Sequence, residues 1–392
     1  MRWFFFLTIL TTLGACAPTR LSEPVGYGWQ AVRGHLHVLA EARPLEDWLN
    51  DPTTPRPLRD RLLRVEDIRT FASKELGLPD NRSYRSYADL KRPYAVWNVF
   101  AAPELSLQLD TWCFPVVGCI SYRGYYDQAQ ARQFADRLAA DGREVHVGGV
   151  PAYSTLGFTP DPVLNTFINL PDGELARLVF HELAHQVVYV DDDSTFNESF
   201  ATAVEVAGVE RWLATRDSET RERYATYAAR RQDFLTLLRA ARASLDALYR
   251  SEQPEGQKRE GKQVLQCQLQ KAYQALRNGP WGGYSGYDRF FAKPPNNAQL
   301  AAVGTYDELV PGFLAMLHEA DPTGIKPLDL FFDRVKTFAK KPRATRRAQL
   351  ATMANLAPAA TAATAVTVGS DAGLNPGKPL FNPSSFCDVR TL

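Results

Sequence analysis

The spacing of hydrophobic residues divides the chain into a mixed first part and a helical second part. Before residue 160, apolar residues recur with a helical period over 55–78 and 126–140, and Gly142 is suited to end the second helix. Apolar–polar alternation and runs of β-branched or aromatic residues predict strands at 94–100, 105–109, 116–122 and 144–149. This part is expected to form a small sheet with a helix over it.

After residue 170 the hydrophobic pattern is almost entirely helical. It predicts helices at 174–189, 197–213, 218–250, 261–276, 311–318 and 328–338. Residues 351–392 include a stretch rich in Ala, Thr, Gly and Pro, and we expect them to form a loose tail. The predicted fold class is α+β, mostly helical, with a small N-terminal sheet and a helical C-terminal lobe.

Composition excludes several classes of protein. The 392 residues include 45 Lys and Arg against 44 Asp and Glu, whereas a general nucleic-acid-binding protein would be basic. The charged fraction of 23% is ordinary for a globular protein and argues against a disordered chain. We therefore expect no nucleic-acid partner.

The first residues are typical of an export signal. Arg2 precedes an apolar run at 4–13, which is shorter than the roughly 20 residues that a membrane-spanning helix needs. The run leads into Leu-Gly-Ala-Cys, ending at Cys16, which resembles the lipobox of bacterial lipoproteins. The resemblance implies a signal peptide at 1–15, a lipid on Cys16 and an anchor linker at 16–27. Because Ala rather than Asp follows the cysteine, we expect an outer-membrane anchor facing the periplasm. The alternative is an ordinary signal peptide with an accidental cysteine.

Four further cysteines remain after Cys16. An exported protein meets an oxidising compartment, so disulfides are allowed. Cys113 and Cys119 are separated by a short segment with Pro and Gly that can turn the chain, and a bridge between them is favoured. A pair between Cys267 and Cys387 follows only by elimination. Zinc binding by the four is an alternative, although the spacings lack the CxxC pairs of structural zinc sites.

The helix predicted at 174–189 contains an HExxH motif made by His181, Glu182 and His185. Residues four apart lie on one face of a helix, so the two imidazoles can bind one zinc ion. Glu182 lies to the side of that face, where it can act as general base for the water that zinc activates. Uncharged residues surround the motif, which is unlike a solvated helix; the alternative is two buried histidines with satisfied hydrogen bonds.

A catalytic zinc site needs a third protein ligand. Asn197-Glu198-Ser-Phe-Ala, with Glu205 seven residues after Glu198, resembles the third-ligand helix of gluzincin metallopeptidases. The resemblance implies that Glu198 is the ligand, and that Glu205 and Asn197 support the ligands from behind. Spacing alone could favour Glu205 as the ligand.

Longer strings resemble a bacterial family of zinc aminopeptidases. They are WCFPVVGC from Trp112, VPAYSTLG from Val150, HELAHQ from His181 and FNESFA from Phe196. The resemblance extends from about residue 28 to about residue 338, and the motifs are specific in combination.

This resemblance implies a zincin-like metallopeptidase domain at 28–350, with a mixed α/β part at 28–160 and a helical part at 161–350. Members of the family are often lipoproteins, which agrees with Cys16. The chain departs from better-known gluzincin aminopeptidases in two ways. The connection between the second histidine and the third ligand is shorter, and the Gly-x-Met-Glu-Asn motif that holds a substrate's free amino group is absent. Exopeptidase specificity therefore stays open.

The resulting hypothesis is a lipid-anchored, zinc-dependent peptidase, by resemblance an aminopeptidase, with peptide substrates and Glu182 as general base. Candidate donors to the oxyanion are Tyr153, Tyr306 and His318; Tyr153 ranks first because its Ser/Thr/Gly-rich turn lies shortly before the zinc helix. The alternatives are a non-catalytic zinc-containing binding or scaffolding lipoprotein and an amidase acting on cell-wall peptides. The intact Glu182 argues against the scaffold, since zinc ligation alone does not require it.

Two further features carry weaker expectations. The strand at 94–100 could pair with an extended peptide substrate or could lie inside a sheet. His35 and His37 have strand spacing but no acidic or cysteine partner nearby, so they are expected to be structural.

Overall fold

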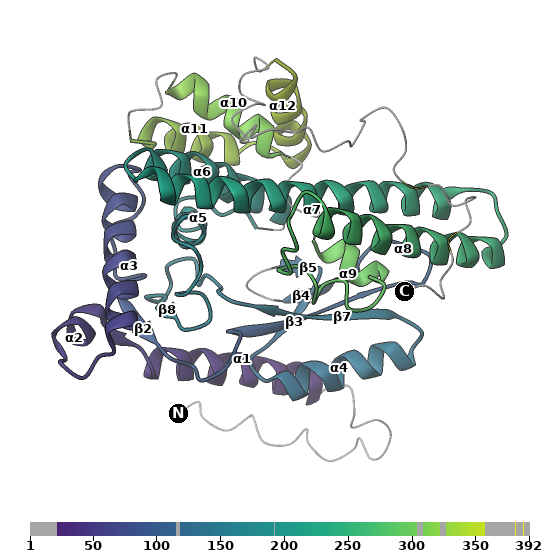
Figure 1. Ribbon diagram of the computed structural model, residues 1–392, viewed down its shortest axis with the longest axis horizontal. Coiled ribbons are helices and arrows are strands. Elements are labelled where there is room, and N and C mark those ends of the chain that lie inside the picture. Colours follow the sequence, from purple (N-terminus) through teal and green to yellow (C-terminus); the bar gives the residue numbers. More distant parts are fainter. Residues whose placement is uncertain are drawn as a thin grey trace, which may run out of the picture.

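Helices account for most of the described chain, and the α+β class predicted from the hydrophobic pattern is confirmed (Figure 1). The computed structural model describes residues 22–114, 118–191, 193–303, 309–321, 327–356, 381 and 387. The helices are α1 (Ser22–Ala40), α2 (Leu45–Asn50), α3 (Arg56–Lys74), α4 (Gln128–Ala140), α5 (Asp172–Ala184), α6 (Ser194–Ala214), α7 (Ser218–Arg250), α8 (Glu255–Asn278), α9 (Asn297–Ala302), α10 (Val310–Ala320), α11 (Asp329–Ala339) and α12 (Arg343–Leu356). The strands are β1 (Arg43–Pro44), β2 (Ser86–Ala88), β3 (Val96–Ala102), β4 (Trp112–Phe114), β5 (Gly118–Ile120), β6 (Arg123–Tyr125), β7 (Glu144–Val150) and β8 (Val163–Leu164).

The predicted small sheet with a helix over it is present. It has the antiparallel order β6-β3-β7, and Trp97 at its centre lies opposite Tyr125 on β6 and Gly149 on β7. Phe134 of α4 packs on this sheet, with its ring 5.8 Å from that of Tyr125 and 5.9 Å from that of Trp112. A second sheet, β1-β2-β8, and the hairpin β4-β5 complete the strands of the described residues.

One strand prediction is wrong, and an alternative that the sequence left open is decided. Residues 105–109 form no strand, because a turn in which the Ser106 amide donates to the Pro103 carbonyl redirects the chain, and Leu107 instead packs against α7 and α8. The strand predicted at 94–100 is β3, which has hydrogen-bonded neighbours on both edges. It is therefore not an edge that could accept an extended peptide.

Helix α1 was not predicted, because three glycines lower its helix propensity. It begins within the segment 16–27 expected to be a linker, and it places His35 and His37 on a helix rather than a strand. Its Val38 is fully buried and holds the helix against the core. In the described part of the chain, no helix is long and apolar enough to cross a membrane.

The C-terminal boundary also differs from expectation. The proposed start of a loose tail at residue 351 falls inside α12, and Phe381 and Cys387 are buried. Disulfides link Cys267 of α8 with Cys387 and, across the β4-β5 hairpin, Cys113 with Cys119. Cys16, Tyr306 and the rest of the tail lie outside the described residues.

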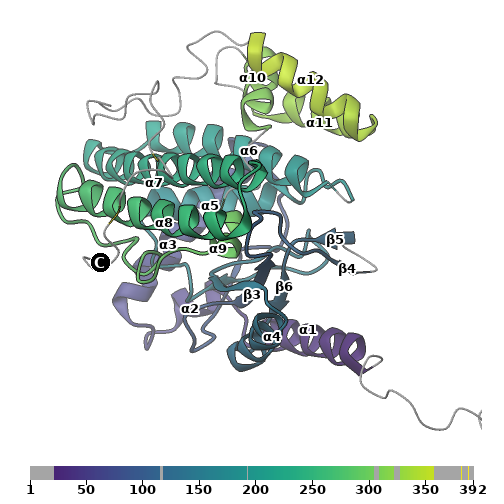
Figure 2. The ribbon, with the colours of Figure 1, turned by 90° about the vertical axis from the view of Figure 1, so that its right-hand side faces the viewer.

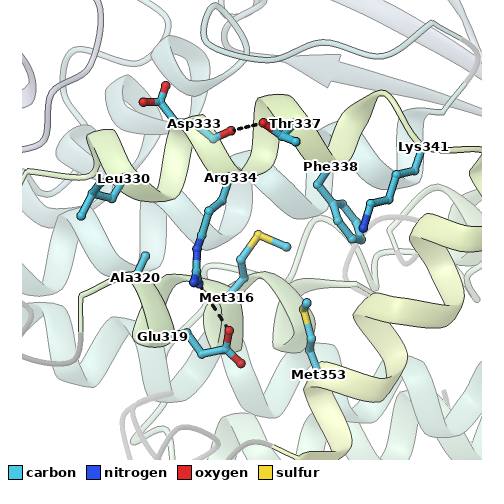
Figure 3. A pocket seen from close by; sticks show the side chains of 10 residues that line it. All are labelled: Met316, Glu319, Ala320, Leu330, Asp333, Arg334, Thr337, Phe338, Lys341 and Met353. Atoms are coloured by element: carbon cyan, nitrogen blue, oxygen red, sulfur yellow. Dashed lines mark hydrogen bonds and ion pairs between the residues drawn. The ribbon is translucent and has the colours of Figure 1, made fainter.

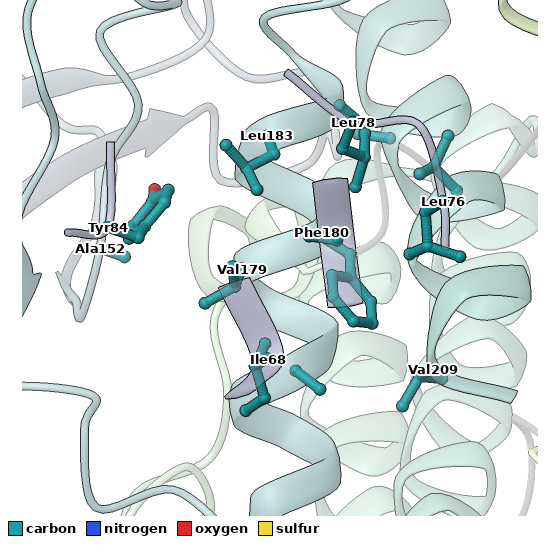
Figure 4. Packing of buried hydrophobic residues seen from close by; sticks show 14 of the residues in the cluster. Ile68, Leu76, Leu78, Tyr84, Ala152, Val179, Phe180, Leu183 and Val209 are labelled. Carbon is teal, nitrogen blue, oxygen red and sulfur yellow. The ribbon is translucent and has the colours of Figure 1, made fainter. Parts of the chain in front are cut away.

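Helices α5 and α6 pack against each other at the centre of the main hydrophobic core. Phe180 of α5 is fully buried and lies beside Leu76 and Val209 (Figure 4). The contact with α6 is close: a Cβ on Gly208 would lie 2.8 Å from side-chain atoms of both Phe180 and Leu76. Glycine at this position therefore sets the separation of the two helices.

Two further helical groups flank this pair (Figures 1 and 2). The α7–α8 hairpin has its own aromatic core, in which the rings of Phe234 and Tyr287 stack 4.0 Å apart. Helices α10, α11 and α12 pack against α6 on the side away from the sheets, through residues that include Phe313 and Phe331.

Replacing Gly208 with Ala is expected to lower the free energy of unfolding by about 1–3 kcal/mol, because the added methyl group overpacks the α5–α6 contact. Gly256→Ala in α8 is a matched control, since a Cβ there meets nothing within 4 Å; it should leave stability unchanged or raise it by up to about 1 kcal/mol. Urea unfolding of the two variants measures both effects. Equal stability of the two variants would contradict the packing described here.

Candidate metal centre

Helix α5 carries the HExxH motif. Pro171 precedes the helix, and Asp172 and Glu174 in its first turn suit the positive end of the helix dipole. The helix ends earlier than predicted, but His185 at its C-cap keeps helical backbone angles, and its amide donates to the His181 carbonyl. The two imidazoles therefore retain the four-residue spacing on one face.

The connection to α6 is fixed by side chains. Asn197 both accepts a hydrogen bond from the Val190 amide and donates one to the Val190 carbonyl, each 2.8 Å long. Asp193 caps α6 by accepting from the Phe196 amide and pairs at 2.5 Å with Arg346 of α12. These contacts hold the start of α6 beside the end of α5, so the Glu198 side chain faces the two histidines.

His181, His185 and Glu198 form a cluster whose ligand-type atoms lie within 4.8 Å of one another. The two Nε2 atoms are 3.1 Å apart, and the Glu198 carboxylate oxygens lie 3.3 Å from Nε2 of His181 and 3.7 Å from Nε2 of His185. Ligand atoms about 2.0–2.1 Å from a tetrahedral zinc ion are about 3.3 Å apart. The three side chains therefore have the spacing and chemistry of a zinc-ligand set.

Glu205 lies behind His181 rather than inside the cluster. Its Oε2 is 2.9 Å from Nδ1 of His181, and its Oε1 accepts from Arg177 at 2.7 Å. A carboxylate on Nδ1 keeps the proton there and leaves Nε2 available to a metal ion. This geometry favours Glu198 over Glu205 as the third ligand. No such partner reaches Nδ1 of His185 within the described residues.

The electrostatics of the cluster favour a positive charge at its centre. Burial lowers the pKa of His181, but hydrogen bonds to Glu198 and Glu205 outweigh burial and raise that pKa to about 10. Burial would raise the pKa of Glu205, but the charge of Arg177 and the bond to His181 bring it down to about 2. Burial and the charge of His181 lower the pKa of His185 to about 4. A proton or a metal cation bound between these side chains would balance the negative charge of the carboxylates.

Glu182 lies in the wall of a cavity of about 420 Å³ that His181 and Glu198 also line. Burial raises the pKa of Glu182 to about 7, with neighbouring carboxylates adding to the effect and His181 opposing it. A carboxylate with that pKa can take up and release a proton near neutral pH.

A comparison with known families matches residues 26–350 to the family described as "Putative aminopeptidase". The chain belongs to this family. The match includes the cluster, Glu182 and the whole α7–α8 hairpin. Membership indicates a peptidase, with a peptide as its substrate. No curated protein and no solved structure matches the chain.

Of the oxyanion-donor candidates, the two that the structure of this aminopeptidase-family chain describes, Tyr153 and His318, do not lie at the cluster. The hydroxyl of Tyr153 lies 2.9 Å from Nδ1 of His35 and also bonds to Tyr126, and Tyr153 does not line the 420 Å³ cavity. His318 is exposed on α10, and Tyr306 lies outside the described residues.

Five polar residues that line the cavity were not identified as site residues from the sequence: Arg177 of α5, Thr202 of α6, Tyr227 and Arg231 of α7, and Tyr287. The Arg-rich α7 is most simply interpreted as a solvated face, and only its docking over α5 reveals the role of Arg231. The four-residue spacing of Tyr227 and Arg231 puts both on one face of α7, but it does not show that this face turns towards the cavity.

A wider groove of about 670 Å³ lies between α10, α11 and α12 (Figure 3). It is lined by Met316, Leu330 and Phe338, and its Glu319 and Arg334 pair with each other. No histidine or cysteine lines it, so the cluster of ligand-type side chains lies at the smaller cavity.

Glu205→Gln is expected to lower the free energy of unfolding by about 3–5 kcal/mol at pH 7 with chelator present, because it removes the buried negative charge that Arg177 and His181 share. It leaves each of them one carboxylate partner, Glu174 and Glu198 respectively. Glu210→Gln, an exposed position on the same helix, is the control and should change little. Urea unfolding measures both variants. A Glu205→Gln protein as stable as the control would mean that the buried network does not hold the site.

Proposed function

We propose that the protein is a lipid-anchored, zinc-dependent peptidase, probed first as an aminopeptidase because of its family. The observation that carries the proposal is the convergence of both histidine Nε2 atoms and the Glu198 carboxylate, next to a cavity that His181, Glu182 and Glu198 line. A zincin-like fold is part of this proposal. It is supported by an HExxH helix followed by a helix that presents a glutamate to both histidines.

In this proposal His181, His185 and Glu198 hold the zinc ion. When bound, zinc acts as a Lewis acid and lowers the pKa of water from 15.7 to about 7. Glu182 accepts the proton of the attacking water at its carboxylate and delivers it to the leaving amine nitrogen. Glu205 keeps the His181 ring oriented through Nδ1.

A scaffold with a structural zinc ion is less well supported. Such a site is usually closed by four protein ligands, whereas the cluster has three among the described residues and opens on a cavity. A carboxylate with a pKa near 7 beside the ligands is also unnecessary for structure alone.

Glu182→Gln should keep one zinc ion per chain and lower kcat on peptide substrates by at least about 100- to 10,000-fold, because the amide cannot accept the proton. The test measures zinc content by elemental analysis and turnover on a peptide library with free or blocked N-termini. His185→Ala is the companion variant and should lose zinc as well as activity. A wild-type protein with stoichiometric zinc and no Glu182-dependent turnover of any peptide would refute the peptidase.

Anchoring through a lipid on Cys16, in the outer membrane facing the periplasm, is a further part of the proposal. It is supported by the lipobox-like sequence and by α1, which follows it closely. One face of α1 exposes Trp29, Val32 and Leu36, whose exposed fractions are 69%, 53% and 58%. Their spacing makes an apolar stripe on the helix surface, and Trp favours membrane interfaces.

Cys16→Ser should move the protein from the detergent-extracted membrane fraction to the soluble periplasmic fraction, because the residue that receives the lipid is removed. Cell fractionation with immunoblotting measures the change, and labelling with a fatty-acid analogue verifies the lipid on the wild type. A variant that stays in the membrane fraction would contradict an anchor at this residue.

A further inference from the structure

Helix α7 and Tyr287, which lies between α8 and α9, form a wall of the cavity that members of the ligand cluster also line. Tyr227 and Arg231 lie one turn apart on α7, and Phe234 follows on the same face. Tyr287 closes this wall, with its ring stacked on Phe234 at 4.0 Å and an interplanar angle of 8°. The stacking fixes the wall, so its polar groups are held in place before a substrate arrives.

The acidic groups of this cavity are already engaged. Glu205 is paired with Arg177 and His181, and Glu198 faces His181 and His185. The remaining carboxylate, Glu182, is assigned to proton transfer. No carboxylate that lines the described cavity is left to bind a substrate's amino group, which agrees with the absence of Gly-x-Met-Glu-Asn from the sequence.

Unlike these acidic groups, Arg231 is not paired with another residue of the described chain. It is half-buried, and it makes no hydrogen bond or ion pair with any residue of the described chain. Its neighbour Asp233 is used elsewhere, because it accepts from the Trp281 indole at 2.9 Å. The charge of Arg231 acts on Glu205, Tyr227 and Tyr287, which places the guanidinium within electrostatic range of the cluster.

The two tyrosines beside Arg231 are hydrogen-bond donors. Burial raises the pKa of Tyr227 to about 12, and burial also raises that of Tyr287, so both phenols are neutral near pH 7. Neither hydroxyl has a hydrogen-bond partner within the described residues. A guanidinium with two free hydroxyls suits an anion. In a peptide substrate that anion is a carboxylate, which a guanidinium can bind through two parallel hydrogen bonds.

We propose that Arg231, with Tyr227 and Tyr287, binds a carboxylate of the substrate on the C-terminal side of the bond that is cut. The inference rests on the proposed peptidase function and defines its substrate class as short peptides with a carboxylate within reach of the cluster. The cavity volume of about 420 Å³ lies at the lower end of the range for small-ligand sites, about 300–1,000 Å³. Short peptides fit this space.

The carboxylate has two sources, the C-terminus of the peptide or an acidic side chain. The test uses the zinc-loaded mature protein and three peptides: Ala-Ala-Ala with a free C-terminus, the same peptide as its C-terminal amide, and Ala-Asp-Ala amide. Wild type should cut the free acid about 10- to 100-fold more efficiently than the matched amide, mainly through a lower KM. Recovery of efficient cleavage with Ala-Asp-Ala amide would identify a side-chain carboxylate as a sufficient source.

Arg231→Met should abolish the preference for the carboxylate, measured as the ratio of kcat/KM for the acid to that for the amide in the same variant, while zinc content stays unchanged. Arg231→Lys should restore part of this preference. Arg223→Met is the control, since Arg223 is an exposed arginine on the same helix. Equal cleavage of acid and amide by wild type, or a preference that survives in Arg231→Met, would overturn the proposal.

Binding separates this proposal from the peptidase function. Calorimetry with the Glu182→Gln protein measures the affinity for the acid and the amide without turnover. An Arg231-dependent preference for the acid in binding, together with a zinc-loaded wild-type protein that cuts no peptide, would sustain the carboxylate site and refute the peptidase. Cleavage of peptides by the wild-type protein, with no preference for the acid in binding, would sustain the peptidase and refute the carboxylate site.

Discussion

The buried carboxylate of Glu205 is the interaction on which the rest of the site depends. It is only 2% exposed, and it joins Arg177 and His181 in one network. An unpaired charge at this depth would be costly, so the three groups must come together for α5 and α6 to pack. The same bond to Nδ1 orients the His181 ring, and thereby directs Nε2 towards His185 and Glu198.

Contacts further from Glu205 also help to hold α5 and α6 in position. Gly208 lets α6 approach Phe180 of α5, while Asn197 and Asp193 fix the turn between the two helices. Helix α12 contributes Arg346 to Asp193, so even the C-terminal helical group bears on the position of Glu198. The α7–α8 hairpin then covers the open side and creates the cavity.

The sequence predicts those features that depend on local spacing. His181 and His185 converge because four residues make about one helical turn, and the predicted start of the next helix carries Glu198. Features that depend on packing between distant segments could not be predicted from local spacing. Arg231 reaches the cavity only because α7 packs over α5. The hydroxyl of Tyr153 bonds to His35 of α1, a helix that was not predicted because its glycines lower its helix propensity. The turn after Pro103 likewise replaces a strand that alternation alone indicates.

The central claim, that His181, His185 and Glu198 hold a zinc ion with Glu205 behind them, is tested most directly by anomalous diffraction at the zinc edge from crystals of the wild-type protein. The account predicts one peak about 2.0–2.2 Å from Nε2 of each histidine and from a Glu198 oxygen, with Glu205 still bonded to Nδ1 of His181. A zinc peak bound to Glu205 in place of Glu198, or the absence of zinc from this cluster in a zinc-loaded crystal, would contradict it.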